Sequence, residues 1–443
     1  MPKRPSVGHR VRRRLLRWWR NWQWPFIAAL ALGGIVLGYV GYSRYYADTT
    51  GWTRSPLDFL FYSLQLLALE FNAFDRPIPW ELHVARFLLP AVAGFTAVKA
   101  VVALYSEQLQ NLVVRLFVRD HTVVCGLGER GLVLTRQLRR RGQTVVVVEQ
   151  DAENDQIGVA REEGATVIVG DATDEHALRR AGVCRARHVV ATCQDDGRNA
   201  EIGVRVCALA GHSGRLHSCI CHVFGSRLRR LIDRHRQQDT ESTAAMLRFF
   251  SVYEYGAEVL LELDQPFSAD PAIAPHIMVL GIGRMGEALL VRLAELWKSG
   301  NGDDGARLRI VVGDRAALEK RDFLLSEYPD LARVWQLEPV KVEVKSPEFQ
   351  AGVFLREEGR HRTLTRVYVC LDDDSLGLAA ALTIEDRLKA EHRQVPIVLR
   401  TRTYGGLAVL MPRVDDPRCP PNCLKAFGLL DHTCTPDAIA ARR

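Results

Sequence analysis

Residues 26–43 form an uncharged, largely apolar run that follows Pro25 and ends before Arg44. This length is near the lower limit for a helix that crosses a hydrocarbon core of about 30 Å, where a spanning segment must pair its own backbone groups. Aromatic residues flank the run as at membrane interfaces: Trp18, Trp19, Trp22 and Trp24 precede it, and Tyr42, Tyr45 and Tyr46 lie at and after its end. We interpret the run as a transmembrane helix. A cleaved signal peptide is the alternative, which the long apolar run and large basic head disfavour.

Much of the net charge of +7 lies at the N-terminus, where Lys3 and several arginines precede the apolar run. A basic block beside an apolar helix indicates membrane topology, with the block in the cytosol, in preference to an arm that binds nucleic acid. We therefore expect residues 1–25 to be a basic cytosolic N-terminus, with membrane lipid and not nucleic acid as a partner.

A second apolar run, residues 87–104, contains Pro90 near its start and Lys99 towards its cytosolic half. Two spans return the chain to the cytosol, which makes this a multi-pass cell-membrane protein with most of its residues in the cytoplasm. Between the spans, residues 57–71 are apolar but short, which suits a re-entrant or interfacial helix. The predicted transmembrane region covers residues 26–105, and a linker helix follows over residues 106–120.

The order of these segments, a span, a short pore-like helix and a second span, resembles the layout of two-helix ion channels. The threonine- and glycine-rich filter strand of that family is missing, and Leu69, Glu70, Phe71 and Asn72 stand in its place. Glu70 is the candidate pore residue, as one of a ring of carboxylates, although an interfacial carboxylate is the favoured interpretation. Lys99 would repel cations if it faced a pore.

The pattern changes at residue 121, where HTVVCGLGERG (121–131) reads as an apolar strand leading into three spaced glycines. A helical stretch and a second strand follow, and this strand ends at Glu149. In such a βαβ unit the glycines allow a tight turn, close approach of a pyrophosphate and helix packing, while the helix N-terminus offers amide donors. Glu149 is placed to accept from ribose hydroxyls and would repel a 2′-phosphate. We predict a Rossmann-type domain that binds NAD(H) or an adenine nucleotide; a fold that has lost its ligand is the alternative.

Residues 162–202 carry Gly170-Asp171-Ala172-Thr173 after one strand and Asp195-Asp196 after the next. Together with the glycine motif, this segment resembles the N-terminal domain of RCK proteins, the regulators of K⁺ conductance, also called TrkA-N. The resemblance implies that Gly126, Gly128, Gly131, Glu149 and Asp171 contact the ligand, with Leu127, Glu129, Arg130, Gln150 and Ala172 in the same loops. Arg130 is either a phosphate contact or a solvated helix residue. The resemblance also implies a homo-oligomer, a dimer or tetramer formed through the RCK lobes.

HIMVLGIGRMG (276–286) restates residues 121–131, and later strands, including residues 341–346 and 396–401, continue the parallel. This is an internal duplication. We place the first domain at residues 121–239, a crossover helix and linker at 240–275, a second, degenerate domain at 276–412 and a C-terminal tail at 413–443. Lys345-Ser346-Pro347-Glu348 stands where the first copy has Gly170 to Thr173. The second copy is therefore either a ligand site or a structural, dimerising lobe. The predicted fold class is a membrane α-helical segment followed by α/β, with two tandem Rossmann-like RCK domains built on parallel sheets.

Two groups of cysteine and histidine are candidate metal sites. The first is His217, Cys219, Cys221 and His222, and the second is Cys419, Cys423, His432 and Cys434. The alternation in the first group fits a buried strand, so we favour core cysteines over zinc. The irregular spacing of the second group makes a metal site the weaker alternative there. We predict no metal.

Three classes of function fit these features unequally. The favoured one is nucleotide-regulated transport of a monovalent cation, potassium, by a channel-like membrane protein gated by cytosolic RCK domains. The alternative is a membrane-anchored sensor of NAD or adenine nucleotide that regulates a separate ion transporter and has no pore. An NAD-dependent enzyme fits least, because the chain offers neither a substrate domain nor a catalytic set beside a nicotinamide.

Overall fold

The computed structural model describes residues 7–47, 55–71, 77–104, 114, 118–210, 215–225, 246–267, 274–301, 307–356, 360–420 and 422–440. The chain forms two compact units, Met1–Gln110 and Asn111–Arg443, which are described separately below. The predicted linker helix over residues 106–120 lies largely outside the described residues.

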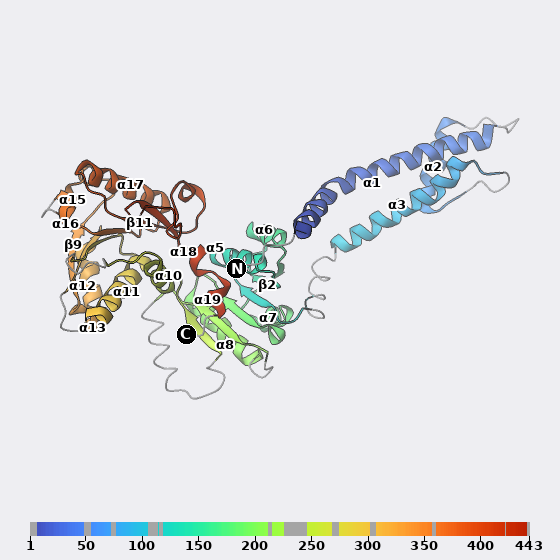
Figure 1. The fold of residues 1–443 in the computed structure, drawn as a ribbon. Helices are drawn as coiled ribbons and strands as arrows, with labels where there is room; N and C mark the ends of the chain where they lie inside the picture. The colour runs from blue at the N-terminus through green and yellow to red at the C-terminus, as the bar shows by residue number, and fades with distance from the viewer. Residues whose placement is uncertain are drawn as a thin grey trace. The chain divides into compact units, whose positions relative to one another are not determined.

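The first unit is helical in its described part. Its elements are α1 (Val7–Ala47), α2 (Pro56–Gln65), the 3₁₀ turn η1 (Leu66–Ala68) and α3 (Trp80–Leu104). Two segments are long and apolar enough to cross a membrane, Trp22–Ala47 and Trp80–Val101, so both predicted spans are found as candidate membrane helices. The second begins earlier than predicted, because α3 starts at Trp80 and Pro90 lies inside the helix, not near its start. In Figure 1, α1 and α3 lie side by side, with α2 and η1 packed against them.

Glycines on α1 allow α3 to approach closely. A Cβ at Gly34 would lie 2.8 Å from Leu89 Cδ2, and a Cβ at Gly41 would lie 2.8 Å from the backbone nitrogen of Leu82. Lipid tails are as apolar as leucine, so membrane helices are held together by close packing of this kind and not by a hydrophobic force.

The second unit begins with a six-stranded sheet. Its strands are β1 (Thr122–Cys125), β2 (Val145–Glu149), β3 (Thr166–Val169), β4 (His188–Ala191), β5 (Ser218–His222) and β6 (Leu247–Phe250), in the order β3-β2-β1-β4-β5-β6. All neighbours pair in parallel. The connecting elements are α5 (Glu129–Arg140), α6 (Gln156–Glu162), α7 (Glu175–Arg180), η2 (Val183–Arg185) and α8 (Asp196–Ala210). Strand β2 is a run of buried valines, as expected of a parallel strand covered on both faces.

A second six-stranded sheet follows helix α10 (Val252–Leu263). Its strands are β7 (His276–Leu280), β8 (Leu308–Asp314), β9 (Trp335–Lys341), β10 (Arg366–Val369), β11 (Ile397–Thr401) and β12 (Leu424–Gly428). The order β12-β11-β10-β7-β8-β9, with every neighbour parallel, repeats that of the first sheet. The predicted fold class, membrane helices followed by two Rossmann-like domains, is therefore confirmed.

The helices of the second domain are mostly short. They are α11 (Arg284–Asn301), α12 (Ala317–Glu327), α13 (Pro329–Ala332), α14 (Pro347–Ala351), α15 (Val353–Arg356), α16 (Arg360–Thr363), α17 (Asp374–Ala390), η5 (Gly406–Leu410), α18 (Leu429–Thr433) and α19 (Pro436–Ala440).

Three segments differ from the sequence-based expectation. Within residues 240–275, expected to be a crossover helix and linker, the helix α10 begins only at Val252 and strand β6 precedes it, because Leu247–Phe250 pairs with the open edge of β5 and this pairing overrides the helical pattern. The third strand of the second copy is β9, not residues 341–346. Residues 413–443, expected to be a tail, contain β12, which completes the second sheet, and α18 and α19, which lie beside α5 of the first domain (Figure 1).

Candidate nucleotide-binding site

A cavity of about 920 Å³ opens at the carboxyl ends of the first sheet. In open parallel sheets, ligands bind where the strand order reverses, which here is between β1 and β4. Nine of the ten residues predicted from the sequence line this cavity: Gly126, Leu127, Gly128, Glu129, Arg130, Glu149, Gln150, Asp171 and Ala172. The tenth, Gly131, lies behind the glycine loop. The fold thus gathers residues from three separate loops around one space.

The glycine loop has the backbone geometry that the motif requires. Gly126 has a φ of 92°, in the left-handed region that favours glycine. A Cβ on Gly131 would lie 2.0 Å from the carbonyl oxygen of Gly126, so any side chain there would push α5 away from the loop. At Gly128, the N-cap of α5, the described residues place no atom within 4 Å of a Cβ. The loop is therefore open where free amides and the helix dipole favour an anion.

Glu149, at the end of β2, accepts hydrogen bonds from the glycine loop and from the loop that follows β2. Its Oε2 accepts from the amide of Leu127 at 2.6 Å, and its Oε1 accepts from the amide of Asp151 at 3.0 Å. Each carboxylate oxygen has a further lone pair, so these bonds leave acceptors for a ribose hydroxyl.

Asp171, after β3, is fixed by two neighbours. It accepts from the amide and hydroxyl of Thr173 at 2.8 and 2.7 Å, and Arg198 from α8 donates to both of its oxygens at 2.9 and 2.8 Å. Burial opposes ionisation, but these bonds outweigh it and lower the pKa of Asp171. The side chain is therefore a rigid, ionised wall of the cavity.

The second domain completes the cavity, a contribution that no sequence motif predicted. Its contribution consists of Arg284, Asp372, Arg400, Arg402, Leu429 and Leu430. A glycine motif predicts what its own domain binds, but it does not predict which side chains that domain contributes to the site of a neighbouring domain. One signal was present in the sequence: Arg284 stands within the second glycine motif, in the first turn of α11, where the helix dipole disfavours a cation.

The arginines that line the cavity are neutralised to different extents. Arg198 pairs with Asp171 at 2.8 Å, and Arg402 crosses between the domains to Glu129 at 3.3 Å. Arg400 is only 5% exposed and lies 3.7 Å from an oxygen of Asp374. Within the described residues, its Nε has no hydrogen-bond partner.

Arg130 and Arg284 both stack on the ring of Phe224, with guanidinium carbons 4.4 and 4.5 Å from its centroid. In the described part of the chain neither guanidinium has a carboxylate partner within salt-bridge distance. Beside them, His222 is 1% exposed, and burial together with the charges of Arg130 and Arg284 lowers its pKa to about 3. Two cations thus meet at this end of the cavity beside a neutral histidine.

In the second domain, Asp314, Lys320 and Asp372 stand at the equivalent loops. Asp314 repeats the bonds of Glu149, accepting from the amides of Ile282 and Ala316, but it is also paired with Lys320 at 2.7 Å. A Cβ at Gly283 would lie 3.2 Å from Oδ2 of Asp372, so a carboxylate stands against the glycine that corresponds to Gly128.

The position that corresponds to Asp171 is Glu343. The amide of Val342 donates to the backbone carbonyl oxygen of Asp314 as that of Gly170 donates to the backbone carbonyl oxygen of Glu149, which fixes the alignment. The alignment of Lys345 to Glu348 with Gly170 to Thr173 is therefore wrong by three residues, because β9 ends at Lys341 and Val342, not Lys345, corresponds to Gly170. Glu343 is paired with Arg315 at 2.7 Å, which adds to the difference between the copies.

Comparison with known proteins places a family name on the first domain. The family model of the TrkA-N domain matches residues 122–218, from β1 to the start of β5. Residues 122–218 are a TrkA-N domain. The predicted resemblance is confirmed, and the matched segment contains the glycine loop, Glu149, Asp171 and Arg198.

The curated proteins that this chain resembles include potassium channels. The voltage-gated potassium channel Kch of Escherichia coli is 36% identical over 84 residues, which cover 18% of this chain and 20% of Kch. Potassium channel protein 1 of Methanocaldococcus jannaschii is 20% identical over 179 residues, which cover 40% of this chain and 48% of that protein. The chain thus spans between a fifth and a half of the length of these curated relatives.

Among solved structures, the GsuK channel bound to NAD covers 94% of this chain and 82% of its own, with 13% identity and a TM-score of 0.46. The GsuK structure bound to ADP covers 87% of this chain and 90% of its own, with 17% identity and a TM-score of 0.43.

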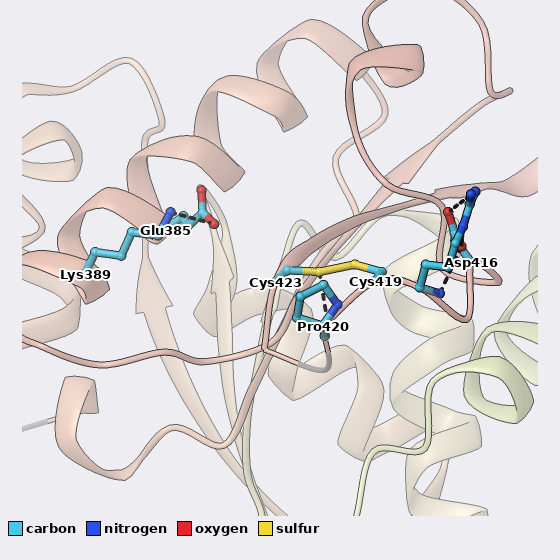
Figure 2. Close-up of a disulfide and its surroundings, with 7 residues drawn as sticks. Glu385, Lys389, Asp416, Cys419, Pro420 and Cys423 are labelled. Atoms are coloured by element: carbon cyan, nitrogen blue, oxygen red, sulfur yellow. Dashed lines mark hydrogen bonds and ion pairs between the residues drawn. A yellow bond between two sulfur atoms is a disulfide. The ribbon is translucent and has the colours of Figure 1, made fainter.

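The cysteine groups do not form a metal site in the described residues. Cys219 and Cys221 are buried in β5 beside the sheet core, as expected of core cysteines. Cys419 and Cys423 are bonded to each other in the loop before β12 (Figure 2). His432 bonds the hydroxyl of Tyr404 at 2.8 Å and stacks on Phe427.

Glu70 and Lys99, the candidate polar residues of the first unit, have separate hydrogen-bond partners. Glu70 is exposed and accepts from Nε2 of Gln65 at 3.0 Å. Lys99 donates to Oε1 of Gln23 on α1 at 2.9 Å. In the described residues of this unit, η1 ends at Leu69 with a φ of 66°, so residues 66–69 form a tight turn and not an extended strand.

Proposed function

We propose that this protein transports potassium, or another monovalent cation, across the cell membrane and that nucleotide binding to its TrkA-N domain regulates the transport. The observation that carries the proposal is the cavity at the switch point, in which the open Gly128 faces Glu149 and Asp171. The chain joins this site to two candidate membrane helices. Curated proteins to which parts of this chain are similar include potassium channels.

The ligand in this proposal is NAD(H) or an adenine nucleotide. Its pyrophosphate lies at the N-terminus of α5, against Gly126, Leu127 and Gly128, with Gly131 supporting the turn. Glu149 and Gln150 contact the ribose, and Asp171 and Ala172 contact the adenosine side. Glu129 and Arg130 stand at the phosphate end. We assign no catalytic residue, and no histidine is among the residues that line the cavity.

The proposed regulation is a population shift. Residues 106–120 connect the second candidate span to β1, so a movement of the TrkA-N domain on ligand binding reaches the spans through this linker. A ligand can bias the pore only if its affinity differs between the open and closed states. We propose a homo-oligomer in lipid, a dimer or tetramer through the RCK lobes, with the N-terminus and both domains in the cytoplasm.

The binding step is tested by thermal stabilisation of the full chain in detergent. Ligand at a hundredfold excess over its dissociation constant stabilises a protein by about 2.7 kcal/mol. We expect NAD(H) or ATP to raise the melting temperature of the wild type. Gly128→Asp places a carboxylate at the phosphate site and should abolish the rise.

Gly158→Asp is the matched control, because Gly158 on α6 is exposed and a Cβ there meets nothing within 4 Å in the described residues. It adds the same charge to the same domain and should keep the rise. Equal stabilisation of both variants would remove the glycine loop from the proposal.

The transport step is tested in planar bilayers with K⁺, Na⁺ or Ca²⁺, with and without nucleotide. Nucleotide-dependent unitary currents are expected. A second candidate function, an anchored sensor that regulates a separate ion transporter, is favoured by the tight turn at residues 66–69 and by Lys99. If a verified oligomer that still binds nucleotide carries no current, the result favours the anchored sensor.

A further inference from the structure

The connection between η5 and β12, residues 411–423, carries a disulfide between Cys419 and Cys423 (Figure 2). Both cysteines are partly exposed, and Arg418 and Pro420 beside them are exposed, so a small molecule in solvent reaches the sulfur atoms. Thiols of cytosolic proteins are kept reduced by glutathione and thioredoxin, and the disulfides that do form there are mostly transient and redox-sensing. In a domain placed in the cytoplasm, this bond therefore points to a reversible link and not to a permanent staple.

The loop that the disulfide closes keeps its two thiols close after reduction. Three residues lie between the cysteines in the sequence, and two of them are prolines. Proline fixes its own φ at about −65°, so a loop this short has few conformations. The amide of Cys419 also donates to the carbonyl oxygen of Asp416 at 3.1 Å, a bond that does not depend on sulfur. Closure of the disulfide is consequently an intramolecular step between thiols that are already neighbours.

The same connection covers the open edge of the second sheet. Strand β12 is at this edge, and its Ala426 exchanges two backbone hydrogen bonds with the connection. The amide of Ala426 donates to the carbonyl oxygen of Pro412 at 2.8 Å, and its carbonyl oxygen accepts from the amide of Val414 at 2.9 Å. The disulfide ties the far end of this cover to Cys423, the residue before β12. Because an edge strand depends on such cover for its unpaired backbone groups, the disulfide stabilises β12.

Strand β12 leads directly into α18, which supplies part of the wall of the nucleotide cavity through Leu429 and Leu430. The connection reaches α18 by a second route as well. The guanidinium of Arg413 lies 4.1 Å from the centroid of the Tyr404 ring, and the amide of Tyr404 donates to Asp431 at 2.6 Å. Loosening of the connection is therefore transmitted to the cavity wall.

We propose that Cys419 and Cys423 form a reversible redox site, that small thiols and disulfides such as glutathione are its reactants, and that its disulfide strengthens nucleotide binding. The inference rests on the proposed function. In oxidation, the thiolate of one cysteine attacks a sulfur of glutathione disulfide, and one glutathione thiolate leaves. The second cysteine then displaces the other glutathione. Two protein thiols thus lose two protons and two electrons, and one glutathione disulfide becomes two glutathione thiols; reduction is the reverse exchange.

The test equilibrates the purified full chain in buffers that contain reduced and oxidised glutathione in different ratios. Free thiols are then alkylated in denaturant, and peptide masses show whether Cys419 and Cys423 are bonded to each other or carry glutathione. We expect the bond to open and close with the ratio. Reduction should lower the melting temperature by about 2–5 °C, as expected of opening a short loop.

Nucleotide affinity is measured in the two states by isothermal titration with ATP and with NAD⁺. The ligand that binds should lose about 3- to 10-fold in affinity on reduction, since apparent affinity falls with the fraction of molecules whose cavity wall is in place. The double variant Cys419→Ser with Cys423→Ser should show the affinity and the melting temperature of the reduced wild type at every ratio. Agreement of these melting temperatures separates loss of the bond from loss of folding.

Cys184→Ser is the matched control, because Cys184 is a partly exposed free thiol in the same unit and does not line the cavity. It should keep the whole response. A bond that stays closed at the most reducing ratio, thiols that never pair, or a wild-type affinity that does not depend on the ratio overturns the inference while the nucleotide site stands. If the wild type binds neither ATP nor NAD⁺ at any ratio, the proposed function itself fails.

Discussion

At the scale of single residues, the molecule places an unusual neutral histidine beside its nucleotide cavity. His222 ends β5, is 1% exposed, and has no hydrogen-bond partner for either ring nitrogen in the described residues. Burial and the adjacent Arg130 and Arg284 lower its pKa from 6.5 to about 3. Protonation of His222 therefore adds a third positive charge to a desolvated cluster.

This shift makes stability depend on pH. Between pH 6.5 and 3 the unfolded chain binds the proton that the folded chain refuses, so the free energy of unfolding falls as the pH falls through this window. By pH 5 the loss amounts to about 2 kcal/mol. His222→Phe should make the decline in melting temperature between pH 7 and 5 shallower, while His188 and His276, whose pKa burial lowers to about 4, retain part of it. His176→Phe, at an exposed position on α7, should keep the wild-type decline, and parallel curves for all three proteins would contradict the assignment.

A convenient readout exists, because all ten cysteines lie between Cys125 and Cys434 and therefore in the second unit. Most of the free ones are buried. A dye that fluoresces on reaction with thiols consequently reports the unfolding of the two Rossmann-like domains without interference from the membrane helices.

At the scale of elements, one contact links the crossover helix to the end of the second domain. Helix α10 packs on α18 at Gly256, where a Cβ would lie 2.3 Å from Cδ1 of Leu429. Leu429 and Leu430 also line the nucleotide cavity. The spacing of α10 and α18 therefore bears on the shape of the site.

Gly256→Ala should destabilise the second unit by about 1–3 kcal/mol, because the added methyl group overpacks this contact. Leu429→Ala removes the opposing atoms. In a Leu429→Ala background, Gly256→Ala should therefore cost less stability than it costs in the wild type, as expected of residues in contact. Gly158→Ala, where a Cβ is unopposed within the described residues, should instead stabilise by about 0.5–1 kcal/mol. Thermal or urea unfolding of the wild type, the three single variants and the double variant checks these expectations. Strict additivity of Gly256→Ala and Leu429→Ala would argue against direct contact.

The sequence predicts an element well when the residues that stabilise the element are close to it in the chain. The glycine loop follows from a short motif whose strand, turn and helix are neighbours in the chain, so the positions of Gly126, Gly128 and Gly131 were predictable. Strands β6 and β12 were not, because each is short and forms only against a distant partner, β5 or β11. The position of Arg284 in the wall of the cavity was also not predictable, because it depends on how the two domains meet and no single motif encodes that.

At the scale of the whole molecule, the proposed topology places both ends of the membrane unit on one side. The first turn of α2 should then face the opposite side, since Ser55 caps a helix that lies between the two candidate spans. Leu57, in that turn, is 72% exposed.

Labelling with a membrane-impermeant thiol reagent tests this arrangement in intact cells. The wild type should remain unlabelled from outside, because its cysteines all lie in the second unit, and Leu57→Cys should become labelled. In inverted vesicles the partly exposed Cys184 and Cys193 of the wild type should react. Labelling of the wild type from outside would reverse the orientation.

The return of α18 and α19 to α5 has a consequence for synthesis. Because these helices cover the TrkA-N domain but are made after the second sheet, that domain leaves the ribosome with part of its apolar surface uncovered until residues 429–440 have followed. Exposed apolar surface of this kind is where chains misassemble. Ribosomes stalled shortly before residue 429 should therefore hold a nascent chain that recruits chaperones, and release of those chaperones should coincide with the arrival of α18.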